Sequence, residues 1–140
     1  MKDLGVLKYF LGVEVARSAE GLFLSQCKYA LDIIADVGLL GAKPTNVPLP
    51  PNHSLALADG EPLPDPESYR CLVDRLIYLS FTRPDLAYAV HTLAQFMHAP
   101  RSEHWTAALG VVRYLKGTSG QGILLCSHCD LSLSAWCDSD

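Results

Sequence analysis

The chain has 140 residues, of which 49% are hydrophobic and 19% are charged, and its formal net charge is −4. This size and composition suit one modest domain, or parts of two, with a buried core. The acidic balance argues against a dedicated nucleic-acid-binding domain, which is usually basic overall, although it is compatible with local basic patches. No apolar run reaches the length of a membrane span and no signal-peptide pattern is present. We therefore expect no membrane partner and an intracellular protein, cytoplasmic or nuclear.

Residues 6 to 25 are predicted to form a β-hairpin. Leu7 to Ala16 alternate with the period of a strand, and Leu22 to Leu24 return as the second strand after a turn that ends at Gly21. Gly12 interrupts the side-chain surface of the first strand. It indicates either a bulge or a place where another backbone comes close.

One helix and a proline-rich connector are predicted to follow the hairpin. Ser25 is the expected N-cap of the helix, and Gly38 permits its end. Between residues 42 and 65, prolines at 44, 48, 50, 51, 62 and 64 remove amide donors and exclude a regular helix or a central strand. We expect this connector to be a solvated strap on the surface.

Helix signals recur three times between residues 66 and 118. Asp65 and Pro66 open the first helix, Thr82 caps the second, and Ser102 caps a third that stops at Gly117 in the left-handed conformation. Apolar residues recur at helical spacing in all three and should form the core. They are Tyr69, Leu72, Val73, Leu76, Ile77, Leu86, Ala89, Val90, Leu93, Met97, Trp105, Ala108, Leu109, Val112 and Leu115.

The last 22 residues are predicted to hold two antiparallel strands. Ile123 to Cys126 is a short apolar run, and every second residue from Leu131 to Cys137 is apolar or small. The chain therefore reads as an α+β protein with four parts: 1–41 (hairpin and first helix), 42–65 (connector), 66–118 (three-helix bundle) and 119–140 (C-terminal strands).

Five cysteines, at positions 27, 71, 126, 129 and 137, are an odd number in a chain without a secretion signal, so we expect free thiols. Cys126 and Cys129 have the spacing of a zinc-ligand pair. A single pair without a second is more typical of ordinary strand and loop cysteines. We expect no cofactor in this chain.

Several short sequence blocks are spread over the whole chain, and their order is informative. They include Tyr9-Phe10-Leu11-Gly12, Leu24-Ser25-Gln26, Thr82-Arg83-Pro84-Asp85, Arg113-Tyr114-Leu115-Lys116-Gly117-Thr118 and Asp138-Ser139-Asp140. In this order they resemble reverse transcriptases of copia-type retrotransposons, in the part after the polymerase active site, and plant mitochondrial-type fragments derived from them. The resemblance implies a hairpin that holds the primer end, a thumb- and connection-like helical bundle, and the opening strands of a ribonuclease H-like sheet.

The chain lacks carboxylates that a two-metal catalytic site needs, and this determines which activity we expect. Two-metal phosphoryl transfer needs several acidic side chains around its ions, and the chain has no aromatic-x-Asp-Asp turn. Asp138 matches only the first metal-binding aspartate of a ribonuclease H. We therefore expect a partial reverse transcriptase segment that is inactive alone and positions primer–template RNA/DNA together with the rest of its polyprotein. The resemblance implies that Mg²⁺ binds only in the full-length enzyme.

The candidate nucleic-acid-binding residues are Lys8, Gly12, Arg83, Arg113 and Lys116. One alternative is a retained nucleic-acid-binding module, in which these cations and Arg101 interleave with aromatic side chains, namely Tyr9, Tyr78, Trp105 and Tyr114. Another is a helical protein-interaction domain without a nucleic-acid role, which the acidic balance favours. Where the resembling family commonly has Lys-Arg, this chain has Leu109-Gly110, which removes two expected phosphate contacts.

Overall fold

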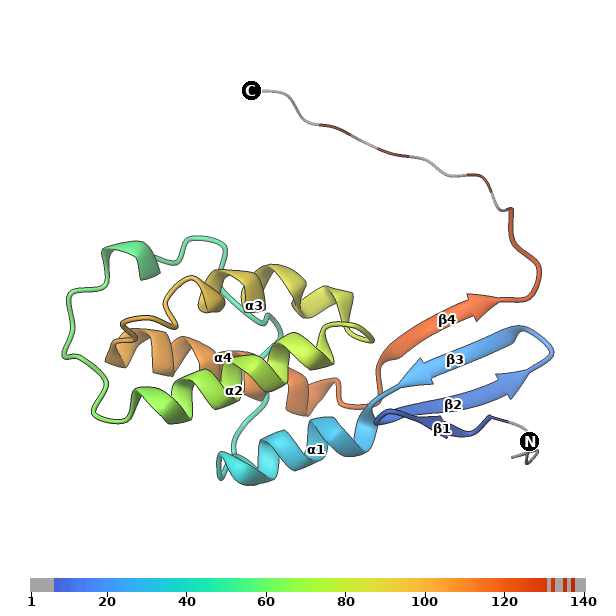
Figure 1. Ribbon diagram of the computed structural model, residues 1–140, viewed down its shortest axis with the longest axis horizontal. Coiled ribbons are helices and arrows are strands. Elements are labelled where there is room, and N and C mark those ends of the chain that lie inside the picture. Colours follow the sequence, from blue (N-terminus) through green and yellow to red (C-terminus); the bar gives the residue numbers. More distant parts are fainter. Residues whose placement is uncertain (1–6, 131, 133–134, 136, 138–140) are drawn as a thin grey trace, which may run out of the picture.

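The computed structural model describes residues 7–130, 132, 135 and 137, and these residues form four helices and one four-stranded sheet. The helices pack together at one end of the molecule, and the sheet extends from the other end (Figure 1). The fold is therefore mixed α and β, as the sequence predicts. The elements, in chain order, are β1 (Tyr9–Phe10), β2 (Val13–Ser18), β3 (Gly21–Ser25), α1 (Cys27–Asp36), η1 (Leu55–Leu57), α2 (Pro66–Leu79), η2 (Pro84–Leu86), α3 (Ala87–Ala94), α4 (Ser102–Gly117) and β4 (Gly122–Cys126).

The predicted first strand is wrong in one respect, because it folds back on itself. Phe10 pairs with Val13, so Leu11 and Gly12 form a two-residue turn between β1 and β2. Both turn residues have positive φ, 47° for Leu11 and 80° for Gly12. Two successive left-handed residues match the twist of a tight hairpin. Gly12 is therefore a turn residue rather than a bulge.

The C-terminal strand β4 pairs antiparallel with β3 and completes the sheet order β1-β2-β3-β4. The strand that we assigned to a separate ribonuclease H-like sheet thus extends the sheet that the hairpin begins. The second predicted strand lies mostly outside the described residues. Those of its positions that are described, 132, 135 and 137, carry no strand.

The first two helices begin and end as follows. Ser25 belongs to β3, so the predicted cap of α1 is wrong and Gln26 is the residue before the helix. Gly38, with φ 72°, supplies the left-handed residue after α1, as predicted. The predicted cap of α2 is confirmed, since Asp65 Oδ1 accepts hydrogen bonds from the backbone N–H groups of Glu67 and Ser68, both at 3.2 Å.

The caps predicted for the other two helices are wrong. Thr82 does not cap a helix; its hydroxyl donates to Gln26 Oε1 at 2.8 Å, and the 3-10 turn η2 precedes α3. Ser102 is already helical in α4, and the backbone N–H of Arg101 donates to His104 Nδ1 at 3.0 Å. Gly117 is the last helical residue and is not left-handed. The start of α4 is thus capped locally, by His104 of its own first turn rather than by Ser102.

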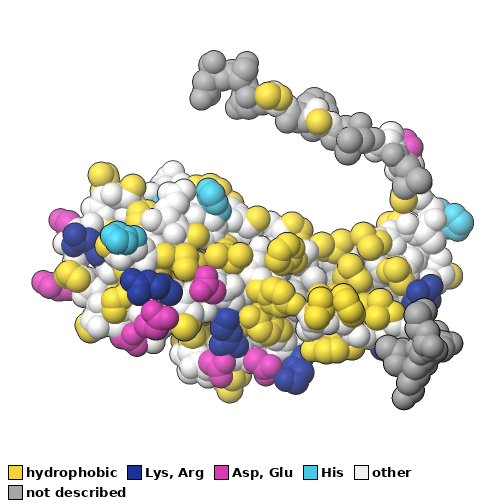
Figure 2. Space-filling model, viewed as in Figure 1, with side chains coloured by type: hydrophobic (Ala, Val, Ile, Leu, Met, Phe, Trp, Pro, Cys, Tyr) yellow, Lys and Arg dark blue, Asp and Glu magenta, His cyan; other side chains and the backbone are white. Residues whose placement is uncertain are grey.

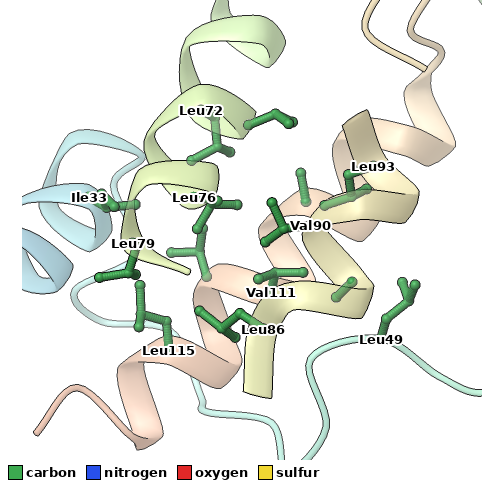
Figure 3. Close-up of a cluster of buried hydrophobic side chains, with 14 of the residues drawn as sticks. Ile33, Leu49, Leu72, Leu76, Leu79, Leu86, Val90, Leu93, Val111 and Leu115 are labelled. Carbon is green, nitrogen blue, oxygen red and sulfur yellow. The ribbon is translucent and has the colours of Figure 1, made fainter. Parts of the chain in front are cut away.

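The core is built by the helices and the connector (Figure 3). Most predicted core residues are buried, whereas Met97, Trp105 and Leu109 are partly buried and Ile77 is 39% exposed. Tyr69 is fully buried, its hydroxyl donates to the Leu93 carbonyl at 2.8 Å, and burial raises its pKa. The buried apolar residues are Ala30, Ile33, Ile34, Leu49, Leu55, Tyr69, Leu72, Val73, Leu76, Leu79, Leu86, Ala89, Val90, Leu93, Ala108, Val111, Val112 and Leu115.

The connector is not simply a solvated strap. Leu49 and Leu55 are buried in the core, which corrects the sequence-based expectation. The connector also bonds to the ends of α4: Thr45 N–H donates to the Arg113 carbonyl at 3.4 Å, and Leu63 N–H donates to the Pro100 carbonyl at 3.0 Å. It is therefore a packed arm along α4.

Within the part of the chain that the structure describes, none of the helices combines the length and the apolar character that crossing a membrane requires.

Candidate nucleic-acid interface

Two of the five candidate residues, Lys8 and Gly12, lie at the hairpin. Lys8 is exposed just before β1, and its carbonyl accepts from the Val15 N–H at 2.9 Å. Gly12 lies in the β1–β2 turn. The Tyr78 hydroxyl of α2 donates to the Leu11 carbonyl beside it, so the turn is fastened to the helical end of the molecule.

Arg83 has an internal role. Its side chain is 2% exposed, and its Nε and Nη2 lie 2.9 and 2.7 Å from the two carboxylate oxygens of Asp85. The guanidinium also donates to the carbonyl and the hydroxyl of Thr118, at 2.8 and 2.7 Å. Because four of its five N–H donors are bound inside the fold and its side chain is buried, Arg83 is not accessible to a phosphate in this conformation.

Tyr114 completes this cluster from α4. Its hydroxyl donates to Asp85 Oδ2 at 3.0 Å, and its ring centroid lies 5.8 Å from the Arg83 guanidinium carbon. Burial by itself would raise the pKa of Asp85, but hydrogen bonding and the charge of Arg83 outweigh it and hold that pKa below its ordinary value. Burial and the neighbouring Asp85 raise the pKa of Tyr114. The cluster joins the start of α3 to the end of α4.

Lys116 and Arg101 bind backbone carbonyls of neighbouring loops. The Lys116 ammonium donates to the carbonyls of Leu40 and Ala42, at 2.5 and 2.6 Å, which ties α4 to the loop after α1. Arg101 Nη1 donates to the Gly60 carbonyl at 2.6 Å, which ties the start of α4 to the connector. These intramolecular contacts give both cations a structural role that requires no nucleic acid.

Arg113 lines a groove of about 510 Å³ between α4 and the connector. Its Nε atom is buried and has no hydrogen-bond partner. Gly110 lines the same groove, where a Cβ atom built on it would lie 3.9 Å from the Pro48 carbonyl. The helix face on which the resembling family was expected to offer phosphate contacts is thus turned toward the connector.

The five candidate residues do not form one surface. The structure brings Lys8 and Gly12 together at the hairpin, and it uses Arg83 and Lys116 inside the helical part. Cations and carboxylates are interspersed on the face shown in Figure 2 rather than separated into a basic stripe. Another exposed cation of the sheet is Arg17, which was predicted to open the turn before the second strand but lies on β2, and which the sequence-based selection missed.

His104 is a buried structural residue that the sequence does not reveal by any spacing rule. Its Nδ1 accepts the Arg101 N–H, so Nε2 carries the ring hydrogen and donates to the Leu55 carbonyl at 3.0 Å. Its ring stacks on Phe96 with centroids 4.0 Å apart. His104 therefore holds the connector against α4.

Among residues 7–130, 132, 135 and 137, no three His, Cys, Asp or Glu side chains gather in a way that could hold a metal ion. Cys27, Cys71, Cys126 and Cys129 form no disulfide, which confirms the expectation of free thiols for these four. Asp138, the candidate metal-binding carboxylate, lies outside the described residues.

Comparison with known proteins gives relatives along the entire chain. The chain is 49% identical over 140 residues to the retrovirus-related Pol polyprotein from transposon RE2 of Arabidopsis thaliana, and the match covers 100% of the chain and 10% of that polyprotein. It is 41% identical over 140 residues to an uncharacterized mitochondrial protein of the same plant, of which it covers 58%. A putative transposon Ty5-1 protein of Saccharomyces cerevisiae is 32% identical over 141 residues, with 46% of its length covered.

No family model and no solved structure matches the chain. The chain spans about a tenth of the length of two Pol polyproteins that it matches, 10% for both RE2 and RE1 of Arabidopsis thaliana. The resemblance inferred from the sequence blocks is thereby confirmed. Over its whole length, the chain is homologous to a segment of the Pol polyproteins of copia-type retrotransposons.

Proposed function

We propose that this chain is the reverse transcriptase segment that follows the polymerase active site in a copia-type Pol polyprotein, and that it helps to position the primer–template there. The proposal rests on the way in which the hairpin is attached to the helical part of the molecule. The β1–β2 turn is held by Tyr78 of α2, and Lys8 and Tyr9 are exposed beside it. A turn fixed to a helical body, with a free cation and a free aromatic ring, suits contact with a nucleic-acid backbone and its bases.

Positioning requires no catalytic carboxylates. The described residues supply a point charge at Lys8, a second exposed cation at Arg17, and aromatic surface at Tyr9. Phosphate contacts of this kind set register and orientation without reading sequence. We expect no primer extension from the purified chain in Mg²⁺, because phosphoryl transfer would need a two-metal site.

The ribonuclease H part of the sequence-based hypothesis stays a prediction. Asp138 would be the first carboxylate of that site and Mg²⁺ would bind only in the full-length enzyme, but Asp138 is outside the described residues. The partnership with the rest of the polyprotein and the intracellular location likewise stay predictions.

The test is the salt dependence of binding to a labelled primer–template. Lys8→Gln and Arg17→Gln should each weaken binding and reduce the slope of log affinity against log salt by about 0.9 for each duplex phosphate that the variant no longer neutralises. Lys43→Gln is the matched control, because Lys43 is an exposed cation on the connector, away from the sheet. Binding that is independent of salt, or equally sensitive to all three substitutions, would count against the hairpin as the contact surface.

A further inference from the structure

The groove between α4 and the connector, which we call the connector groove, is lined by residues between 45 and 55 of the connector and between 102 and 113 of α4. Its volume of about 510 Å³ lies within the range of small-molecule sites. On the side of α4, the small residues Ala107 and Gly110 leave room beside the helix, and most of the lining is apolar. The connector groove therefore has the size and the character of a ligand site.

The connector groove has a carboxylate toward one end and a guanidinium toward the other. Glu103 lies near the start of α4, and Arg113 lies farther along the same helix, about 15 Å away at the helical rise. The Glu103 carboxylate already has partners, because its Oε1 accepts the Gly60 N–H at 2.9 Å and its Oε2 accepts the Ser102 hydroxyl at 3.0 Å. Glu103 is therefore satisfied within the fold and too distant to pair with Arg113.

Arg113 is the unsatisfied group of the connector groove. Its Nε is buried without a hydrogen-bond partner, and no ion pair in the described part of the chain includes Arg113. His53, on the connector side of the same groove, has a second buried nitrogen without a partner, Nδ1. Polar groups that are removed from water without a partner cost free energy. An occupant that brings an acceptor to Arg113 would recover part of that cost.

The other polar groups along the connector groove offer few donors. The hydroxyls of Thr45 and Thr106 donate to backbone carbonyls of α4, at 3.4 and 3.0 Å. Pro48 and Pro50, on the connector side, have no backbone N–H. An extended peptide presents carbonyl groups along its whole length and would leave them unpaired against this wall. A ligand that is apolar along most of its length and carries one anionic end matches the groove better.

We propose that the connector groove binds a small amphipathic monocarboxylate, with the carboxylate on the Arg113 guanidinium and the apolar chain along Gly110 and Ala107. A guanidinium can hold both oxygens of a carboxylate. Arg113 and Ala107 are about 9 Å apart along the helix, which a medium-length alkyl chain spans. A phosphate dianion suits the groove less, because Arg113 is the only Lys or Arg among its lining residues and Glu103 adds a negative charge. This site is separate from the hairpin for which we propose the primer–template contact.

The experiment is a titration of the ¹⁵N-labelled chain with octanoate and with its neutral counterpart octanamide, followed by backbone amide NMR. We expect saturable shifts at Ala107 and Gly110 and an affinity for octanoate roughly tenfold higher than for octanamide, because the carboxylate adds a charge-assisted hydrogen bond. Arg113→Gln should remove this difference by weakening octanoate binding alone, and Arg113→Lys should keep part of it. Arg17→Gln is the matched control, because Arg17 is exposed on β2.

A second variant tests the apolar part of the connector groove. Ala107→Leu should weaken octanoate and octanamide alike, about tenfold, because the larger side chain occupies the space of the alkyl chain. Leucine is a good helix former, and the groove has room for it, so the fold should persist and the amide spectrum checks this. Ala35→Leu, at an exposed position of α1, is the matched control and should leave both affinities unchanged.

Equal affinities for octanoate and octanamide, or an Arg113→Gln variant that binds octanoate as tightly as the native chain, would overturn the inference. So would shifts that do not saturate, or that gather around Phe10 and Leu125, which are exposed apolar residues of the sheet. Displacement of octanoate by inorganic phosphate at equal concentration would overturn the preference for a monocarboxylate. A difference between the two ligands that only the Arg113 substitutions reduce would support it.

Discussion

Arg83 and Asp85 form a two-pronged ion pair across a single proline, with Nε–Oδ1 and Nη2–Oδ2 distances of 2.9 and 2.7 Å. The pair stabilises the fold from inside, because two further guanidinium N–H groups donate to Thr118 at the end of α4. A residue whose motif suggested a nucleic-acid contact therefore holds two helices together. Substitution of Arg83 should therefore first lower the stability of the fold.

Arg83→Met is expected to lower the free energy of unfolding by roughly 3 kcal/mol, because it leaves Asp85 without its buried partner. Arg83→Lys should recover part of this stability, since an ammonium keeps the charge but not the fork geometry. Urea denaturation followed by circular dichroism measures both. Arg17→Met, at an exposed strand position, is the control and should change stability little. An Arg83→Met variant with unchanged stability but weakened primer–template binding would restore the nucleic-acid role.

The same pair predicts how stability depends on pH. The pKa of Asp85 is lower in the folded state than its ordinary value of 3.8, so the unfolded chain takes up protons first as the pH falls. The stabilisation is complete well above pH 3.8 and is lost as the pH falls below it, through the folded pKa. Urea midpoints between about pH 6 and about pH 2.5 should therefore drop more steeply for the native chain than for Asp85→Asn. Parallel curves for the two proteins would contradict the prediction.

The hairpin turn gives a backbone prediction. Gly12→Ala should destabilise the fold by about 1 kcal/mol, because the substituted residue must hold a positive φ of 80°. Leu11→Asn should stabilise it by a few tenths of a kcal/mol, because Asn followed by Gly is the preferred pair for this turn. Gly41→Ala is the matched control, since a Cβ there meets nothing within 4 Å. Thermal unfolding measures all three, and equal shifts for Gly12→Ala and Gly41→Ala would be inconsistent with a left-handed turn.

Local signals in the sequence predicted most of the secondary structure, because helical spacing and the Asp65 cap act within one turn of the chain. Two of the errors share one cause. Thr82 pairs with Gln26, which is 56 residues away in the sequence, and β4 pairs with β3 across the whole helical part. Such contacts are set by tertiary packing, which no local pattern encodes.

The candidate nucleic-acid-binding residues show the same limit of sequence-based prediction more strongly. Arg83, Arg113 and Lys116 are equivalent in the sequence, as cations near helix ends. In the fold Arg83 is buried against Asp85 and Thr118, Lys116 binds two carbonyls of the loop after α1, and Arg113 has a buried Nε without a partner. Charge alone could not distinguish them, because the distinction depends on which carboxylate or carbonyl the fold brings near.

Substitutions at positions 109 and 110 test whether α4 can carry the residues that the resembling family commonly has there. Gly110→Ala should stabilise the chain by up to about 1 kcal/mol, because it removes a glycine from a helix interior and its Cβ would lie 3.9 Å from the Pro48 carbonyl, an ordinary contact. Leu109→Lys with Gly110→Arg should instead destabilise the chain. Leu109 packs against the core, and a long cation at 110 would enter the groove beside Arg113. Urea denaturation distinguishes the two variants. A double variant that is as stable as Gly110→Ala, with stronger and more salt-dependent primer–template binding, would show that this face of α4 opens away from the connector.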